Sequence, residues 1–208
     1  MPHKTDSRPR VWLLMAALAA SVVAAPCGFA QGGFDLRQLM QLLAQVKVGK
    51  AQFVERRTVA MLEQTLESSG RLSFEAPDTF MRETLEPRPE KLVVVGNQLT
   101  LTQGKRVRTL ALDATPEAAV MVEAIRGTLT GNRDALERYF KASVTGEARE
   151  WRLELTPRDW RLLSQVRTIR VSGRDAVVRE VAVSLADGDR SVMSIEPLAP
   201  AAPAPARP

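Results

Sequence analysis

Residues 70–102 read GRLSFEAPDTFMRETLEPRPEKLVVVGNQLTLT, and this stretch determines the fold class. Leu72 and Phe74 alternate with polar side chains, and Leu99 and Leu101 repeat the pattern further along. Successive side chains of a strand point to opposite faces, so this alternation predicts strands that are buried on one face. Short turn signals separate the apolar runs, at Gly96-Asn97, Gln103-Gly104, Gly173 and Asp187-Gly188. Connections of this length predict an antiparallel meander.

The segments outside this stretch add helices and further strands. Apolar residues at three- and four-residue spacing predict helices with one buried face. We expect three of them, at 35–47, from Thr115 as a cap through Ile125, and from Asn132 to Phe140. Alternation of period two returns in three later strands, at 151–155, 177–185 and 190–195.

The architecture that accommodates this order is mainly β, an α+β fold. We expect one strongly curved antiparallel sheet of about ten to eleven strands, an unclosed barrel, with helices packed in its concave side as a lid. A closed barrel would leave the helices without a place to bury their apolar faces. Helices in the mouth of an open barrel would also enclose an apolar cavity.

Residues 1–30 are typical of an export signal. Three basic residues precede an apolar stretch at 11–25, and small residues follow it. Cleavage is expected after Ala30, with cleavage after Ala25 as the alternative. We therefore expect a soluble periplasmic protein. Its divisions are a signal peptide at 1–30, one binding domain at 31–196, and a disordered tail rich in proline and alanine at 197–208.

Charge and the single cysteine exclude two further classes. Cleavage after Ala30 removes Cys27, and Pro26 directly before Cys27 argues against a lipoprotein anchor there. The formal net charge of the chain is +5, but from Gln31 onward 26 basic and 23 acidic side chains remain, in no long block of one sign. This balance is typical of a solvated surface, so we expect no binding of nucleic acid.

Catalytic patterns are missing from the sequence. The only histidine, His3, belongs to the expected signal, which removes serine–histidine and cysteine–histidine mechanisms and the usual zinc ligands. Asp187-Gly188-Asp189 is interpreted as a hairpin turn, because Leu198 stands where a calcium loop needs a glutamate. A pair of carboxylates acting alone stays open as an alternative, although nothing singles out one pair. We expect a protein that is not an enzyme and that carries no cofactor and no metal.

Several motifs resemble the LolA family of periplasmic carriers, which ferry lipoproteins to the outer membrane. The chain has a Pro77-x-x-Phe80 turn after a strand, a proline-rich turn at 87–89, and a Gly96-x-x-Leu99 hairpin. A later strand at 151–157 ends in Leu-Thr-Pro, and Phe53 resembles the aromatic residue of the family's first strand. The similarity covers about Phe34 to Ile195, nearly the whole expected domain. It implies an unclosed barrel with helices as a lid, a cavity for acyl chains, and no catalytic residues.

Two departures point to a divergent branch of that family. Ala76 stands where the typical carrier has an arginine that helps to hold the lid closed. The typical carrier also continues into an additional loop and strand, whereas here proline-rich sequence follows Ile195 directly. The cargo is therefore expected to be a lipoprotein, or the specialised lipid or product of a dedicated envelope pathway.

The expected binding residues are the inward apolar positions of the sheet and the lid. They are Phe53, Leu72, Phe74, Phe80, Leu99 and Leu101 from the sheet and Met121, Val122 and Ile125 from the lid. The alternative is that they form ordinary core. Phe80 is the leading candidate, and Arg82 is expected to meet an anionic headgroup or to point into solvent.

The expected partners are an inner-membrane donor complex and an outer-membrane acceptor, since an acyl chain leaves one apolar site only for another. We expect a monomer in complex with acylated lipoprotein or other lipid cargo. The competing function is a non-enzymatic envelope assembly or interaction protein with a filled core.

Overall fold

The computed structural model describes residues 33–62, 64–114 and 116–198. The expected signal peptide, the cap at Thr115 and all but the start of the expected tail lie outside these residues. The elements in chain order are α1 (Leu36–Leu43), β1 (Val48–Val59), η1 (Ala60–Leu62), β2 (Gln64–Glu75), β3 (Thr79–Glu86), β4 (Glu90–Val95), β5 (Gln98–Gln103), β6 (Arg106–Ala111), η2 (Leu112–Ala114), α2 (Pro116–Thr130), α3 (Arg133–Tyr139), β7 (Phe140–Glu147), β8 (Glu150–Pro157), α4 (Trp160–Leu163), β9 (Val166–Arg174), β10 (Val177–Leu185) and β11 (Arg190–Pro197).

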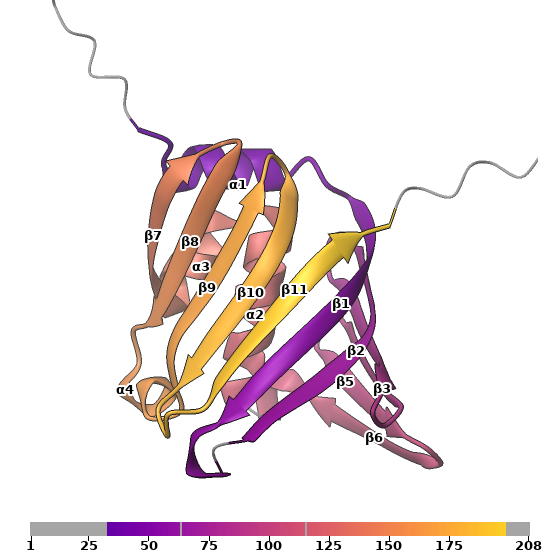
Figure 1. Ribbon diagram of the computed structural model, residues 1–208. Coiled ribbons are helices and arrows are strands. Elements are labelled where there is room, and N and C mark those ends of the chain that lie inside the picture. The colour runs from indigo at the N-terminus through magenta and orange to yellow at the C-terminus, as the bar shows by residue number, and fades with distance from the viewer. Residues whose placement is uncertain (1–32, 63, 115, 199–208) are drawn as a thin grey trace, which may run out of the picture. The chain divides into compact units, whose positions relative to one another are not determined.

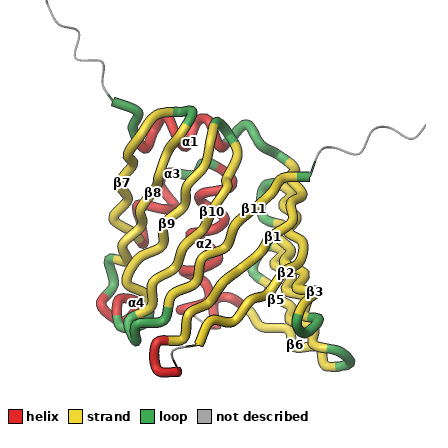
Figure 2. Tube along the Cα trace, viewed as in Figure 1, coloured by secondary structure: helices red, strands yellow, loops and turns green. Residues whose placement is uncertain are grey.

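All strands form one antiparallel sheet that does not close. The order is β6-β5-β4-β3-β2-β1-β11-β10-β9-β8-β7, so the eleven strands end in the unpaired edges β6 and β7. The chain passes from one edge to the other through η2, α2 and α3. Figures 1 and 2 show α2 and α3 behind the curved sheet. The expected fold class, an unclosed antiparallel barrel with helices, is confirmed.

Local signals explain where the helices begin and end. Asp35 forms a capping box with Gln38, which starts α1 one residue later. The helix ends at Leu43 and not at Lys47 as expected, because Val48 already pairs with Glu75 in the β1–β2 ladder. Asn132 caps α3 by accepting a hydrogen bond from the Ala135 amide, as the sequence predicts.

Two details differ from the sequence prediction. A fourth helix, α4, begins after Asp159, whose side chain accepts a hydrogen bond from the Arg161 amide. Four residues are too few to show a helical period, although Asp159 was a visible cap signal. The last strand extends beyond the expected 190–195 to Pro197, and the Leu198 amide still donates to the Lys50 carbonyl oxygen.

Two separate apolar clusters hold the helices against the sheet. The large cluster joins α1, α2, α3 and α4 to strands β7 to β10, and includes Trp151, Leu153 and Leu155. The small cluster has three buried members among the described residues, Val94, Leu112 and Val122, and joins α2 and η2 to strands β3 to β5. Helix α2 belongs to both clusters, through Ala124 in the large one and Val122 in the small one.

Two large aromatic rings lie against glycines on the neighbouring strand. Phe53 is paired with Gly70, and a Cβ atom added to Gly70 would lie 2.9 Å from the Phe53 ring and 1.9 Å from the Glu83 carbonyl oxygen. Trp151 is paired with Gly173, where an added Cβ atom would lie 2.5 Å from the Trp151 ring. A glycine is needed at each of these places because the ring and a neighbouring backbone fill the space of a side chain.

Candidate functional site

The strand register places all six predicted sheet residues on the inner face. Residues directly opposite each other in neighbouring strands share a face. One row across the sheet joins Phe74, Phe80, Val94 and Leu99, and the next joins Leu72, Arg82, Leu92 and Leu101. Phe53 lies on the same face of β1 as Ala51, the partner of Leu72. Alternation in the sequence therefore identified the face correctly.

The predicted residues divide into groups that play different packing roles. Phe80, Leu99 and Val122 pack together in the small cluster. Met121 packs against the large cluster, on the other half of the sheet. Ile125 is 37% exposed and is a member of neither cluster. Met121 and Val122 thus pack with different clusters, and a common cavity lined by the three lid residues stays a prediction.

The centre of the inner face lies between the two clusters. Phe53 and Phe74 are buried there, yet neither belongs to either cluster. Leu72, Leu101, Met193 and Ile195 are half-buried on the same face, and among the described residues none packs against a cluster. We call these six residues the central seam. Five of the six lie on the adjacent strands β2, β1 and β11, and Leu101 lies on β5, next to the edge strand β6.

An ion pair lies inside this apolar surface. Arg82 on β3 donates to Glu55 on β1 at 2.5 Å, and the Arg82 guanidinium lies 4.9 Å from the centre of the Phe53 ring. Ser191 also donates to Glu55, and Ser68 does so at 3.5 Å. The Arg82 Nε atom is buried and has no hydrogen-bond partner among the described residues. A partly buried ion pair is costly to desolvate and contributes little net free energy to stability.

Sequence reasoning considered Arg82 but missed its partners. Glu55 follows Phe53 by two residues on the same strand, so the alternation that placed Phe53 inward also placed Glu55 inward. Ser191 lies on β11, opposite Arg57, and only the β1–β11 pairing brings it to Glu55. That pairing joins the first and last strands, which no local pattern predicts.

A second ion pair joins β1 to the turn that precedes β11. Asp189, in the turn before β11, accepts hydrogen bonds from Arg57 at 2.9 Å and from the Ala60 amide at 3.1 Å. The bond from Arg57 and the backbone bond from Ala60 lower the pKa of Asp189 below its ordinary value. The expected hairpin turn at Asp187-Gly188 is present, and the Asp189 side chain fastens it to the β1–β2 connection.

An arginine on α2 joins the lid to the sheet. Arg126 on α2 donates to the Gly96 carbonyl oxygen, in the β4–β5 turn, at 2.6 Å. It also pairs with Glu123 within the helix at 2.6 Å. In the family pattern an arginine before the Pro-x-x-Phe turn helps to hold the lid, and here that position is Ala76. Arg126 also joins lid and sheet, but this arginine belongs to the helix and not to the sheet.

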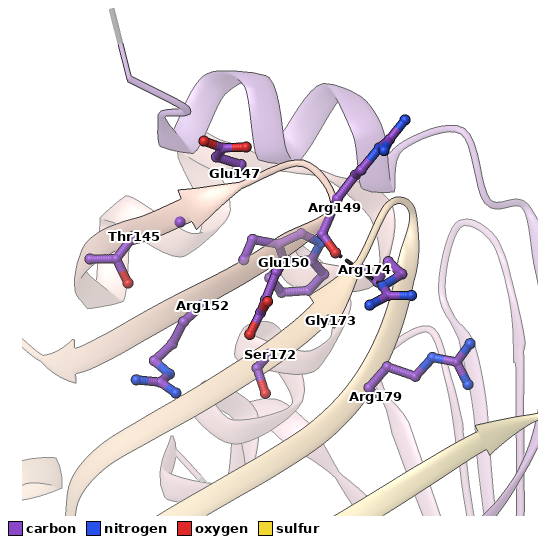
Figure 3. Close-up of a pocket in the computed structure, with 11 residues that line it drawn as sticks. Thr145, Glu147, Arg149, Glu150, Arg152, Ser172, Gly173, Arg174 and Arg179 are labelled. Carbon is purple, nitrogen blue, oxygen red and sulfur yellow. Dashed lines mark hydrogen bonds between the residues drawn. The ribbon is translucent and has the colours of Figure 1, made fainter.

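Two open clefts lie mainly on the outer side of the sheet. One of about 390 Å³ is lined by residues of β1, β2 and β11, including Val54 and Leu85. The other, of about 880 Å³, lies at the tips of the β7–β8 and β9–β10 hairpins (Figure 3). None of the three predicted lid residues lines either cleft.

The described part of the chain contains neither a metal-binding cluster nor a helix that could cross a membrane. It contains no group of three or more histidine, cysteine, aspartate or glutamate side chains able to hold a metal ion. No helix within 33–62, 64–114 or 116–198 is long and apolar enough to cross a membrane.

Comparison with known proteins decides the family. Residues 29–206 match the model of the family described as "Outer membrane lipoprotein carrier protein LolA-like". The chain belongs to this LolA-like family. The match covers the central seam, both clusters and the lid, and the resemblance noted in the sequence is confirmed. The role described for the family is that of a carrier, which is a binding function.

Solved structures similar to this LolA-like chain share little sequence with it. A LolA superfamily protein from Nitrosomonas europaea is 10% identical over 78% of this chain and 91% of its own, with a TM-score of 0.43. A chain of the MucA/MucB complex from Pseudomonas aeruginosa is 14% identical over 82% of this chain and 59% of its own, with a TM-score of 0.45. A putative outer membrane lipoprotein-sorting protein domain from Vibrio parahaemolyticus is 11% identical over 77% and 88%, with a TM-score of 0.41. No curated protein matches the chain.

Proposed function

We propose that this LolA-like protein is a periplasmic carrier that holds the acyl chains of a lipoprotein or other lipidic cargo on the central seam. In this proposal it transfers the cargo from an inner-membrane donor to an outer-membrane acceptor. The observation that carries the proposal is the seam itself. Five of its six apolar side chains lie on β2, β1 and β11 in the middle of the sheet, and none of the six belongs to either core.

The energetics favour a cargo with long hydrocarbon chains. Each buried methylene contributes about 0.8 kcal/mol, so a chain of ordinary length binds without polar contacts. Arg82 and Glu55 then supply the one polar position of the seam. We assign them to the polar end of the cargo, where the partly exposed guanidinium of Arg82 is a donor for a carboxylate or phosphate oxygen.

The two cores differ in size, and this difference sets the direction of opening. Helix α2 is fixed to the large cluster together with α1 and α3, but only Val122 is fully buried from it in the small cluster. The lid therefore opens at the β3–β5 side, where the Arg126 contact, the hydrogen bond from the Leu112 amide to the Asn97 carbonyl oxygen and the small cluster hold it. Phe80, Leu99 and Val122 become accessible to cargo in that opening.

The experiment that tests this function is uptake of an apolar fluorescent probe. The protein should raise the fluorescence of the probe, and Phe80→Glu should weaken the uptake, because it places a charge in the small cluster beside the seam. The matched control is Val95→Glu, an outer-face position of the neighbouring strand that is 52% exposed. A folded Phe80→Glu variant with unchanged uptake would remove Phe80 from the site. Absence of any uptake by the unaltered protein would favour an envelope assembly protein with a filled core.

The identity of the cargo calls for a second measurement. Lipids and lipoproteins that co-purify with the protein from the periplasm can be identified by mass spectrometry. We expect acylated molecules with an anionic or hydrogen-bonding head. If the protein takes up the probe but no such molecule co-purifies with it, the result supports binding of apolar molecules and argues against transport of an acylated cargo.

A further inference from the structure

The hairpin tips of β7–β8 and β9–β10 form a basic cleft that the carrier function does not use. Its volume is about 880 Å³, and four arginines line it, Arg149, Arg152, Arg174 and Arg179, beside Glu147 and Glu150 (Figure 3). All six side chains belong to exposed residues. Among the described residues, no ion pair involves any of the four arginines. The cleft therefore presents more positive than negative charge to solvent.

The backbone that carries these arginines is held in place by contacts between the two hairpins. The indole N–H of Trp151 donates to the Asp175 carbonyl oxygen at 2.8 Å. The Asp175 amide donates to the Ala148 carbonyl oxygen at 2.7 Å, and Arg174 Nε donates to the Arg149 carbonyl oxygen at 3.2 Å. The backbone that carries the arginines is thus held by two turns that are hydrogen-bonded to each other.

A β-bulge adds Arg179 to the cleft. Val178 pairs with Gly173 and Glu180 pairs with Ser172, so Arg179 is the extra residue between two paired positions. A bulge changes the direction of the side chain it carries, and bulges of this kind are frequent next to binding sites. Figure 3 shows Arg179 and Arg174 on one side of Ser172 and Arg152 on the other.

The cleft faces away from the central seam. Arg152 lies between the buried residues Trp151 and Leu153, and it is paired with Thr145 and Ser172 on the outer face of the sheet. Cargo on the inner face therefore does not reach these arginines, and the ligand of the cleft is a different molecule.

We propose that this cleft docks the protein on an anionic phospholipid surface, by contact of the arginines with headgroup phosphates. Guanidinium groups bind phosphate oxygens with paired hydrogen bonds. The four arginines are exposed and spread over three strands and the β7–β8 turn, which suits an array of phosphates and does not enclose one small ion. Trp151 is only 1% exposed, so the lining offers no large apolar side chain for insertion, and docking is peripheral. This inference does not depend on acyl-chain binding, because it can be tested without cargo.

The test is sedimentation of the purified protein with vesicles of phosphatidylcholine alone or with phosphatidylglycerol added. We expect binding to the anionic vesicles only, and weaker binding as salt is raised. The double variant Arg152→Gln and Arg179→Gln removes no hydrogen bond found in the structure, and it should lower the partition coefficient by about thirtyfold, from the usual energy of two arginines at an anionic surface. The matched control, Arg88→Gln with Lys105→Gln, loses the same charge from exposed turns elsewhere and should keep most of the binding.

A variant that is expected to bind more tightly separates an effect of the cleft from misfolding, because misfolding would not raise the binding. Glu147→Gln with Glu150→Gln removes the two acidic side chains of the cleft, and we expect it to raise the partition coefficient. Equal loss in the Arg152/Arg179 variant and in its control would overturn the proposal, because only net charge would then matter. Equal binding to both kinds of vesicle would also overturn it. Displacement from vesicles by low millimolar glycerol phosphate at constant ionic strength would assign the cleft to a free phosphate ligand, and preferential capture of an acidic peptide would assign it to a protein partner.

Discussion

Replacing Arg126 by methionine tests whether the lid opens at the β3–β5 side. The change removes the hydrogen bond to the Gly96 carbonyl oxygen and keeps a side chain of similar length on α2. A hydrogen bond from a charged donor contributes about 1.5–3 kcal/mol, and the low end applies here because the Arg126 side chain is 25% exposed. A loss of about 1.5 kcal/mol raises the population of the open lid by about tenfold.

The assay is stopped-flow mixing of the protein with an apolar fluorescent probe. If the probe enters only the open state, the association rate and the apparent affinity both rise with the open population, so each should increase by about tenfold. Arg133→Met is the control, because Arg133 also pairs with a glutamate of its own helix, Glu137, but has no hydrogen bond to the sheet among those found. Unchanged rates in a folded Arg126→Met protein, or an equal rise in Arg133→Met, would refute this account of the lid.

Three further changes test the seam and the sheet. Arg82→Gln should weaken binding of a fatty-acid probe by about tenfold while an uncharged probe of the same length is little affected, since only the charged head loses a charge-assisted hydrogen bond; equal loss for both probes would place Arg82 outside the polar position. Gly70→Ala should lower the free energy of unfolding by about 1–3 kcal/mol in urea, because the added Cβ meets the Glu83 carbonyl oxygen and the Phe53 ring, whereas Gly49→Ala, with nothing within 4 Å, should not destabilise. Since folding lowers the pKa of Asp189, its ionised form stabilises the fold above the ordinary aspartate pKa of about 3.9, and this contribution disappears as pH falls through the lower folded value. Melting curves of Asp189→Asn and the unaltered protein should therefore converge in acid and separate at neutral pH, and a constant difference across pH would contradict this linkage.

Patterns within a strand or helix predicted much of this structure. Alternation placed Phe53, Leu72, Phe74, Phe80, Leu99 and Leu101 on one face because the pleat gives every strand a period of two. Asn132 marked the start of α3 because its side chain satisfies a free amide of the first turn. These features depend only on residues that are close together in the sequence, so the sequence alone is enough to predict them.

Features that join distant segments were not predictable in the same way. Helical spacing put Met121, Val122 and Ile125 on one stripe, but α2 lies between two cores and uses Met121 and Val122 on different halves of the sheet. The Glu55–Arg82 pair needs the β1–β2–β3 register, and the basic cleft needs two hairpins fastened by Trp151 and Asp175. The bulge at Arg179 leaves no mark in an apolar pattern, since it shifts the register by one residue within a run that still looks like a strand.

The passage of the chain from β6 to β7 has a mechanical consequence. The helical connection is attached at both ends, and its ends lie on opposite edges of the sheet. Such a connection acts as a strap and not as a flap, because a segment anchored at two places cannot swing clear of the surface it crosses. A bulky occupant must therefore tilt α2 or push the two edges apart. The distance between β6 and β7 should then increase with the size of the bound cargo. Spin labels at Val107 on β6 and Ser143 on β7 would measure this distance.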